Sequence, residues 1–294
     1  MRLTYALFVL YIALWSVQGI LVHGLGTRDQ GSLIVLCQEV LKLVISLYFW
    51  KSDNRWTELW NNGYLGLKFF VPAGLYAIYN NLTLIGLSIF DPASYFVLMQ
   101  LRVVVTGLIH SSVFGRQITF NQWIGLFLVM LGGMFKEVSG LEQLVVSGST
   151  RPVLGYLIVG SQILLSTSAG VVTEKYLKTS FVSVSLGNVY MYSISIMMNL
   201  VWVLAVWARG GLDTGEMFPA GSFFVILNGA LMGIVTSLFL KHLNSVWKSI
   251  ASAIELWTTA LLAWLVFGYP IEGGSVLGFS VLSLGVVIYA TSSR

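Results

Sequence analysis

Two stretches of the chain, 153 residues apart, share one sequence pattern. The first is Thr106-Gly-Leu-Ile-His-Ser-Ser-Val-Phe-Gly-Arg-Gln-Ile118, and the second is Thr259-Ala-Leu-Leu-Ala-Trp-Leu-Val-Phe-Gly-Tyr-Pro-Ile271. Six of the 13 aligned positions are identical, and three of these form a shared Val-Phe-Gly turn. Apolar helices often look alike by chance, because they draw on few residue types. The shared turn nevertheless favours an internal duplication.

The composition predicts a membrane protein. Of the 294 residues, 56% are hydrophobic and only 10% are charged, and the mean hydropathy is +0.83. A soluble domain carries roughly 25% charged residues, because its surface has to face water. The composition therefore excludes a soluble enzyme. The 16 basic residues are scattered along the chain, so the sequence has no stripe that would bind nucleic acid.

Long apolar runs follow one another along almost the whole chain. A transmembrane helix needs about 20 apolar residues, and ten windows of this kind can be marked between polar, glycine-containing or proline-containing breaks. They cover 3–22, 31–50, 64–88, 92–114, 118–136, 153–174, 184–208, 219–240, 246–267 and 272–291. The first window is too long for a cleavable signal peptide. We expect an all-α membrane protein with ten transmembrane helices in one integral membrane domain.

The duplicated stretches equate the fourth and fifth windows with the ninth and tenth. The same register places Gly125 over Gly278 and Gly132 over Gly285. The repeat unit is then five helices, and because five is odd, the second copy enters the membrane from the opposite side. Inverted repeats are typical of secondary transporters, whose substrate site lies near the membrane midplane. The expected five-helix repeats are 1–140 and 153–294.

Basic residues outside the windows are distributed unevenly over the two sides. If the N-terminus is cytoplasmic, that side has eight of them and the opposite side has four. The eight are Arg2, Lys51, Arg55, Arg116, Lys175, Lys178, Lys241 and Arg294, and the four are Arg28, Lys136, Arg151 and Arg209. Cytoplasmic segments of membrane proteins carry an excess of lysine and arginine. With an even number of spans, both termini are expected in the cytoplasm.

The few charges within the windows each need an explanation, since a charge at the bilayer centre costs about 2.5–3.5 kcal/mol. Glu39 and Lys42 lie three residues apart on one helical face, and form either a structural charge pair or a gate. Arg102 and Glu255 occupy equivalent repeat positions, which favours either an ion pair between them or a substrate role for Arg102. Lys248 either reaches the membrane interface or faces inward as a cation for an anionic substrate.

Uncharged polar side chains gather in the third and seventh windows. Tyr76, Asn80 and Thr83 lie on one helical face of the third window. Asn188, Tyr192 and Ser195 lie on one helical face of the seventh. Such residues often do no more than join helices by hydrogen bonds. A cation, amide groups and tyrosine rings together also suit a ligand that has a phosphate and an aromatic base.

The sequence gives little support for an enzyme. The histidines His23, His110 and His242 lack the spacing of metal ligands. The sequence contains no Gly-x-Ser-x-Gly nucleophile motif and no intramembrane aspartate pair. We expect neither an enzyme nor a cofactor. A structural membrane bundle is the less favoured alternative to a transporter.

Short motifs follow one another in a specific order along nearly the whole chain. They are Glu39-Val-Leu-Lys42-Leu-Val-Ile-Ser46, Tyr76-Ala-Ile-Tyr-Asn-Asn-Leu82, Asp91-Pro-Ala-Ser-Tyr95, Gln100-Leu-Arg102, Ala169-Gly170 with Glu174-Lys175-x-Leu-Lys178, Asn188-Val-Tyr-Met-Tyr192 and Lys241-His-Leu-Asn-Ser-Val-Trp-Lys248. In order and spacing they resemble the nucleotide-sugar transporters of the drug/metabolite transporter superfamily, in particular the CMP-sialic acid and UDP-galactose branch. The resemblance implies ten helices in two inverted repeats. It also implies a Golgi or ER antiporter that exchanges a nucleotide sugar for the nucleoside monophosphate.

The resemblance further implies a substrate site. The matched positions are Tyr76, Asn80, Asn81, Tyr95, Arg102, Asn188, Tyr192 and Lys248. The repeat offset independently relates Tyr95 to Lys248. The partners implied are the nucleotide sugar, the nucleoside monophosphate and membrane lipid, with a homodimer left open and nucleic acid excluded.

Several positions depart from the usual family pattern. These departures bear on which sugar is transported more than on which nucleotide carries it. The family usually has lysine at Arg102, glutamine at Phe96 and Asp-Asn at Asn244-Ser245. Tyr95 and Tyr192 resemble the CMP-sialic acid branch, so the first hypothesis is a CMP-linked sugar exchanged for CMP. The alternative is a UDP-linked sugar, galactose or N-acetylglucosamine, exchanged for UMP.

Overall fold

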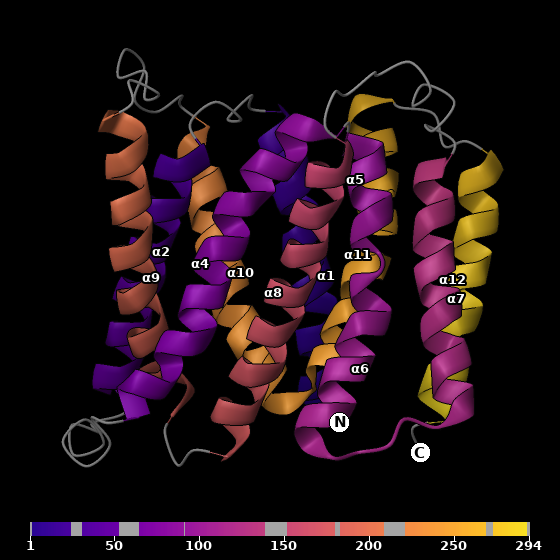
Figure 1. The fold of residues 1–294 in the computed structure, drawn as a ribbon, viewed down its shortest axis with the longest axis horizontal. Coiled ribbons are helices and arrows are strands. Elements are labelled where there is room, and N and C mark those ends of the chain that lie inside the picture. Colours follow the sequence, from indigo (N-terminus) through magenta and orange to yellow (C-terminus); the bar gives the residue numbers. More distant parts are fainter. Residues whose placement is uncertain are drawn as a thin grey trace. The chain divides into compact units, whose positions relative to one another are not determined.

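The computed structural model describes residues 2–24, 31–52, 65–90, 92–138, 152–179, 183–208, 221–268 and 273–292, which form α-helices and turns without any strand. The helices are α1 (Arg2–Gly24), α2 (Gly31–Ser52), α4 (Leu65–Ile89), α5 (Pro92–Met99), α6 (Arg102–Phe114), α7 (Phe120–Val138), α8 (Pro152–Thr179), α9 (Val184–Ala208), α10 (Ser222–His242), α11 (Ser245–Phe267) and α12 (Gly273–Ser292) (Figure 1). They coincide with the expected apolar windows to within a few residues.

Within the described residues, eight helical segments are long and apolar enough to cross a membrane. They are Arg2–Val22, Ser32–Lys51, Tyr95–Phe114, Val153–Thr179, Val184–Ala205, Ser222–His242, Ser245–Phe267 and Gly274–Ser292. The apolar part of α7, Phe120–Phe135, is shorter, and α4 coincides with the expected window 64–88. The all-α membrane class is confirmed, whereas ten crossings and inverted repeats stay predictions.

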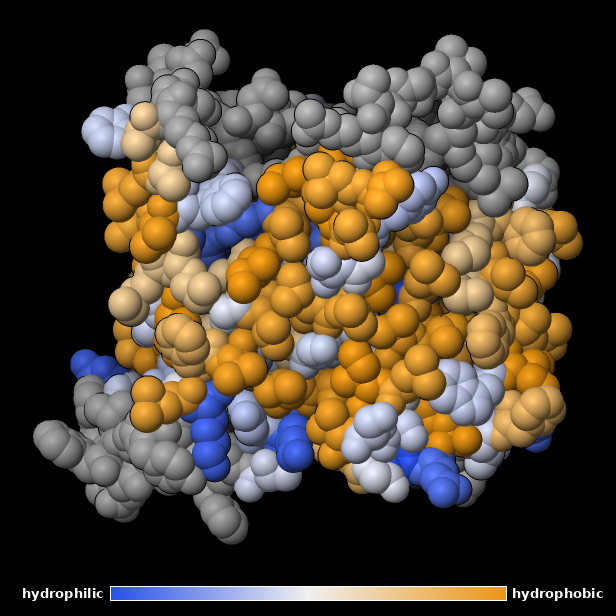
Figure 2. Space-filling model, viewed as in Figure 1, coloured by the Kyte–Doolittle hydropathy of each residue, from blue (hydrophilic) through white to orange (hydrophobic). Residues whose placement is uncertain are grey.

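Large hydrophobic side chains are exposed along the helices. Tyr48, Leu67 and Phe120, for example, are 71%, 75% and 78% exposed. Figure 2 shows hydrophobic residues over most of the visible helical surface. Soluble proteins rarely expose such large apolar areas. This surface is suited to contact with lipid chains.

The window 92–114, expected as one helix, is interrupted between α5 and α6. The backbone N–H groups of Gln100 and Leu101 donate to carbonyls three residues back, at 3.2 and 3.1 Å. Such bonds tighten the helix into a short 3₁₀ turn. The buried Gln100 side chain packs against Gly133 of α7, where a Cβ would lie 2.7 Å from the glutamine Oε1. Arg102 follows this turn as the first residue of α6.

Contacts between α-carbons divide the chain into two compact units. The first contains Met1–Ile78 and Val172–Leu243, and the second contains Tyr79–Val171 and Asn244–Arg294. Both α4 and α8 therefore contribute to each unit. Each unit combines helices of both expected repeats, so the compact units and the sequence repeats divide the chain differently.

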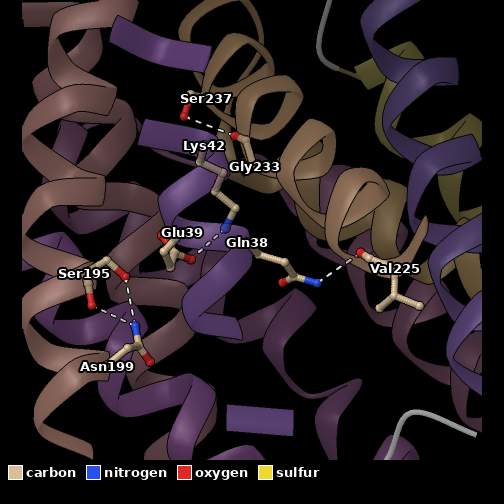
Figure 3. Close-up of polar contacts among 8 residues, drawn as sticks. All are labelled: Gln38, Glu39, Lys42, Ser195, Asn199, Val225, Gly233 and Ser237. Atoms are coloured by element: carbon tan, nitrogen blue, oxygen red, sulfur yellow. Dashed lines mark hydrogen bonds and ion pairs between the residues drawn. The ribbon is translucent and has the colours of Figure 1, made fainter. Parts of the chain in front are cut away.

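In the first unit, α10 packs against α1 and α2, and α2 also packs against α9. Gly229 and Gly233 let α10 approach α2 closely, because small residues allow helix backbones to come together. A Cβ at Gly229 would overlap Gln38 Nε2, and one at Gly233 would lie 2.6 Å from Lys42 Cε. Gln38 donates to the carbonyl of Val225 at 3.2 Å (Figure 3). Two glycines of α10 thus make room for two polar side chains of α2.

In the second unit, α7 and α12 pack backbone to backbone through glycines. A Cβ at Gly125 would lie 2.9 Å from the carbonyl oxygen of Gly285, and one at Gly132 would lie 2.7 Å from that of Gly278. The two helices are therefore antiparallel. The repeat register equates Gly125 with Gly278 and Gly132 with Gly285. Exchanging the two repeat copies therefore turns the Gly125–Gly285 contact into the Gly278–Gly132 contact, and the reverse. This reciprocity supports a local twofold relation of the kind that an inverted duplication predicts.

The glycine contact between α7 and α12 predicts that Gly132→Ala destabilises the protein. The new Cβ would lie 2.5 Å from the backbone nitrogen of Leu282, an atom that cannot move without shifting α12. Overpacking of this kind typically costs about 1–3 kcal/mol. We expect a lower melting temperature in detergent. Gly160→Ala is the control, because nothing lies within 4 Å of its Cβ position. Equal melting temperatures for the two variants would contradict the close contact.

Candidate functional site

An ion pair lies on α2 in the first unit. Lys42 Nζ donates to Glu39 Oε1 at 2.7 Å, and the two side chains are 13% and 6% exposed (Figure 3). The spacing of three residues places both groups on one helical face, and the predicted pairing is confirmed. Mutual neutralisation reduces the cost of placing both charges in apolar surroundings. Whether the pair is structural or a gate stays open as a prediction.

The ammonium group of Lys42 also faces an aromatic ring. Its Nζ lies 5.4 Å from the ring centre of Tyr192 on α9, within the range of a cation–π interaction. Tyr192 is buried, and its hydroxyl is hydrogen-bonded to Ser237 of α10. Tyr76 of α4 is hydrogen-bonded to Thr173 of α8 and interacts electrostatically with both Lys42 and Tyr192. The first unit thus gathers one cation and two tyrosine rings.

One face of α9 carries buried polar side chains, as its sequence spacing predicts. Asn188, Tyr192 and Ser195 are 2%, 5% and 6% exposed. Asn188 Oδ1 is buried and has no hydrogen-bond partner among the described residues. Asn199, which is not among the predicted residues, donates to the carbonyl of Ser195 at 2.8 Å (Figure 3). Because burial of an unpaired amide oxygen is costly, Asn188 is a candidate acceptor for a ligand donor.

The remaining matched positions lie in the second unit. Tyr95 of α5 is buried, and its hydroxyl is hydrogen-bonded to side chains of α4 and α8. Asn80 and Asn81 of α4 are half-buried. Arg102 at the start of α6 is half-buried too, and its Nε lacks a hydrogen-bond partner in the described part of the chain. Tyr95 and Arg102 interact electrostatically.

The structure, which describes both Arg102 and Glu255, shows no ion pair between them. Glu255 Oε1 instead accepts a hydrogen bond at 2.9 Å from Thr259, one turn further along α11. Equivalent positions in two repeats need not touch, and a carboxylate is satisfied by the nearest donor. The other hypothesis for Arg102, a substrate role, stays a prediction.

Lys248 lies in the first turn of α11. Asn244 caps this helix, since its Oδ1 accepts from the Trp247 N–H at 2.8 Å. The carbonyl of Asn244 accepts from the Lys248 N–H at 3.0 Å. Asparagine is among the preferred N-cap residues, so Asn244, one of the departures from the family pattern, has a local structural role. The Lys248 side chain is half-buried, and its binding role stays a prediction.

The predicted site residues are thus shared between the two units. The first unit contains Glu39, Lys42, Tyr76, Asn188 and Tyr192, and the second contains Asn80, Asn81, Tyr95, Arg102 and Lys248. Gln162 of α8 is not among the predicted residues, although it is fully buried in the second unit. Its Nε2 donates to Thr83 Oγ1 at 3.3 Å. The signal that could have identified it is a glutamine inside the apolar window 153–174.

Apolar helices around buried charged and polar side chains are the features of a membrane transport protein. The sequence profile of the nucleotide-sugar transporter family matches residues 26–290, and the chain belongs to this family. It is therefore a transporter and not an enzyme.

Relatives with different named substrates cover most of the chain. The UDP-galactose transporter senju of Drosophila melanogaster is 33% identical over 99% of this chain and 87% of its own length. CMP-sialic acid transporter 1 of Oryza sativa subsp. japonica is 25% identical over 97% of this chain and 93% of its own. One solved crystal structure matches with a TM-score of 0.75 over 100% of this chain and 99% of that one, and at 11% identity it shows the fold alone.

Proposed function

We propose that the protein is an antiporter that carries a nucleotide sugar into the lumen of the Golgi or ER and returns the nucleoside monophosphate. The family match over residues 26–290 carries this proposal. The matched positions support it, because the cations Arg102 and Lys248, together with tyrosine rings and asparagine amides, suit a phosphate linked to an aromatic base. The excess of basic residues on one side supports a cytoplasmic position for both termini.

Two substrates are supported by different observations. The relative at 33% identity is named a UDP-galactose transporter, whereas the CMP-sialic acid transporter of rice is 25% identical. This difference extends over the whole chain and outweighs two single positions, so a UDP-linked sugar is the first candidate. The buried rings of Tyr95 and Tyr192, which resemble the CMP-sialic acid branch, support a CMP-linked sugar as the second.

The proposed exchange predicts trans-stimulation. Proteoliposomes preloaded with UMP or CMP should take up the matching nucleotide sugar much faster than empty proteoliposomes, because the returning nucleotide carries the site back across the membrane. Uptake of radiolabelled UDP-galactose and CMP-sialic acid measures this rate, and competition by unlabelled nucleotides identifies the base.

Ion gradients provide the control for this experiment. The buried charges of α2 neutralise each other in the Glu39–Lys42 pair, so we expect no dependence on a proton or sodium gradient. Uptake that requires such a gradient and ignores internal nucleotide would contradict the proposed exchange. A structural bundle would show no saturable uptake at all.

A further inference from the structure

Two buried hydroxyl groups join α6 and α11 in the second unit. Thr106 Oγ1 and Ser249 Oγ lie 2.8 Å apart, and the two residues are 2% and 8% exposed. On the same two helices, Val103 of α6 packs in one buried apolar cluster with Ile250 and Ala253 of α11. The hydroxyl pair is thus a specific polar contact between two helices that also pack through apolar side chains.

The single proton of each hydroxyl sets the direction of the hydrogen bonds. Thr106 Oγ1 also donates to the backbone carbonyl of Arg102 at 2.6 Å. Because a hydroxyl has only one proton to donate, the proton of Thr106 is used by this carbonyl. The bond between the two hydroxyls therefore has Ser249 as its donor. The result is a chain of two hydrogen bonds that runs from Ser249 through Thr106 to Arg102.

The hydrogen-bond chain ends at the point where the window 92–114 resumes as a helix. Arg102 is the first residue of α6 and directly follows the 3₁₀ turn at Gln100 and Leu101. A threonine hydroxyl that bonds to the carbonyl one turn back adds a side-chain contact to the helix backbone. Since Thr106 is itself bonded to Ser249, this contact ties the Arg102 backbone to α11.

The hydrogen-bond chain begins next to the other candidate cation of the second unit. Ser249 directly follows Lys248 near the start of α11, where Asn244 caps the helix. The two hydrogen bonds therefore connect the turn that carries Lys248 with the turn that carries Arg102. Both cations are half-buried, and both are matched positions of the candidate substrate site.

The spacing of two cations decides how well they bind one phosphate group. Ammonium and guanidinium groups bind phosphate through charge-assisted hydrogen bonds of about 2.7–2.9 Å. Such bonds tolerate little displacement of the donors, so the backbone that carries them has to be held in place. A hydrogen bond between the two turns is suited to this task, because it fixes one helix against the other without occupying either cation.

We propose that Thr106 and Ser249 are positioning residues, which hold the turns of Arg102 and Lys248 at the spacing that binds the phosphate of the nucleotide. This inference rests on the proposed exchange of a nucleotide sugar. Neither hydroxyl has to touch the substrate, because each acts through the backbone next to a cation. The alternative is that the pair only stabilises the contact between α6 and α11, as interhelical hydrogen bonds commonly do.

The test separates phosphate binding from stability in the reconstituted full-length protein. Thr106→Val removes the hydroxyl and keeps the shape of the side chain, so it breaks the hydrogen-bond chain without opening a cavity. UMP should then compete for exchange roughly threefold to tenfold less well, the effect of losing one net hydrogen bond. Uridine, which lacks the phosphate, should compete as it does with the wild type. Thr106→Ser keeps the hydroxyl and loses a buried methyl group, so it should melt at a lower temperature but keep the wild-type preference for UMP over uridine.

Two further variants complete the comparison. Ser249→Ala breaks the same chain, and the double variant Thr106→Val/Ser249→Ala should lose no more UMP competition than Thr106→Val alone, because residues of one hydrogen-bond chain are not additive. Thr167→Val is the matched control. Thr167 is also a buried threonine of the second unit, and its hydroxyl donates to the carbonyl of Ile163 within α8 at 2.7 Å. This variant should leave the preference for UMP unchanged.

An unchanged preference for UMP over uridine in Thr106→Val would overturn the positioning role and leave the pair a stabilising contact only. A lost preference in Thr106→Ser, or an equal loss in Thr167→Val, would overturn it as well. If Thr106→Val does not fold, the same comparison with Ser249→Ala decides. Absence of nucleotide-stimulated exchange in the wild type would overturn the proposed function and the positioning role with it.

Discussion

Lys42→Met is expected to destabilise the protein by about 3–5 kcal/mol, the usual cost of leaving a buried ion without its partner. The lysine stem packs against Gly233 of α10, where methionine can take its place without a void. Glu39, only 4% exposed, would then keep its carboxylate in apolar surroundings. Thermal unfolding in detergent, followed by intrinsic tryptophan fluorescence, should show a much lower melting temperature than the wild type.

The double variant Glu39→Gln/Lys42→Met is the matched control, because it removes both charges and leaves no buried ion. It should recover most of the lost stability. Lys68→Met, which replaces an exposed lysine of α4, should have little effect. A Lys42→Met protein as stable as the wild type would contradict the importance of the pair. Exchange activity of the folded double variant then separates the hypotheses: retained exchange indicates a structural pair, and lost exchange indicates a gate.

Helix positions were predictable because apolar runs and polar breaks are local properties of the sequence. Besides the interruption of the window 92–114, one exception lies at the end of α8 and has a physical reason. The window 153–174 ends at a charge, whereas the helix continues to Thr179. Glu174 is buried and pairs with Lys178 at 2.8 Å, and Lys178 also donates to the carbonyl of Leu243. Lys178, which hydropathy assigns to the break after the window, is thus paired with Glu174 within the helix.

Side-chain partners across helices could not be predicted from local patterns. Asn228 of α10 donates to Gln18 Oε1 of α1 at 2.8 Å, although the two residues are 210 positions apart. Gln162 and Thr83 are likewise 79 positions apart. An amide or hydroxyl in an apolar window signals a buried polar contact, but its partner depends on which helices pack together.

Equivalent glycines of the two repeat copies make equivalent backbone contacts, whereas equivalent charged side chains do not pair. Gly125 contacts Gly285 and Gly132 contacts Gly278, because glycine contacts follow from the helix paths alone. Arg102 and Glu255 are equivalent as well, yet they do not pair. A long charged side chain has several conformations and binds the nearest suitable group, here Thr259 for Glu255.

Lys248→Ala is expected to weaken the binding of UMP and CMP by roughly 10- to 100-fold, the effect of losing a hydrogen bond to a charged group. The nucleotide brings negative charge to membrane depth, where water screens poorly. Lys248 lies in the first turn of α11, whose positive helix end adds to its own charge. The Asn244 cap, with its 2.8 Å bond to Trp247, fixes this turn. Thermal-shift titration of each nucleotide measures the loss.

Lys68→Ala is the matched control for the loss of a lysine, since this exposed side chain lies near the start of α4. The variant should be stabilised by UMP and CMP as the wild type is. Ligand stabilisation that persists in Lys248→Ala would show that another group holds the phosphate. Arg102 is the next candidate, because its Nε is buried without a hydrogen-bond partner among the described residues. Loss of stabilisation in Arg102→Ala but not in Lys248→Ala would assign the phosphate to α6.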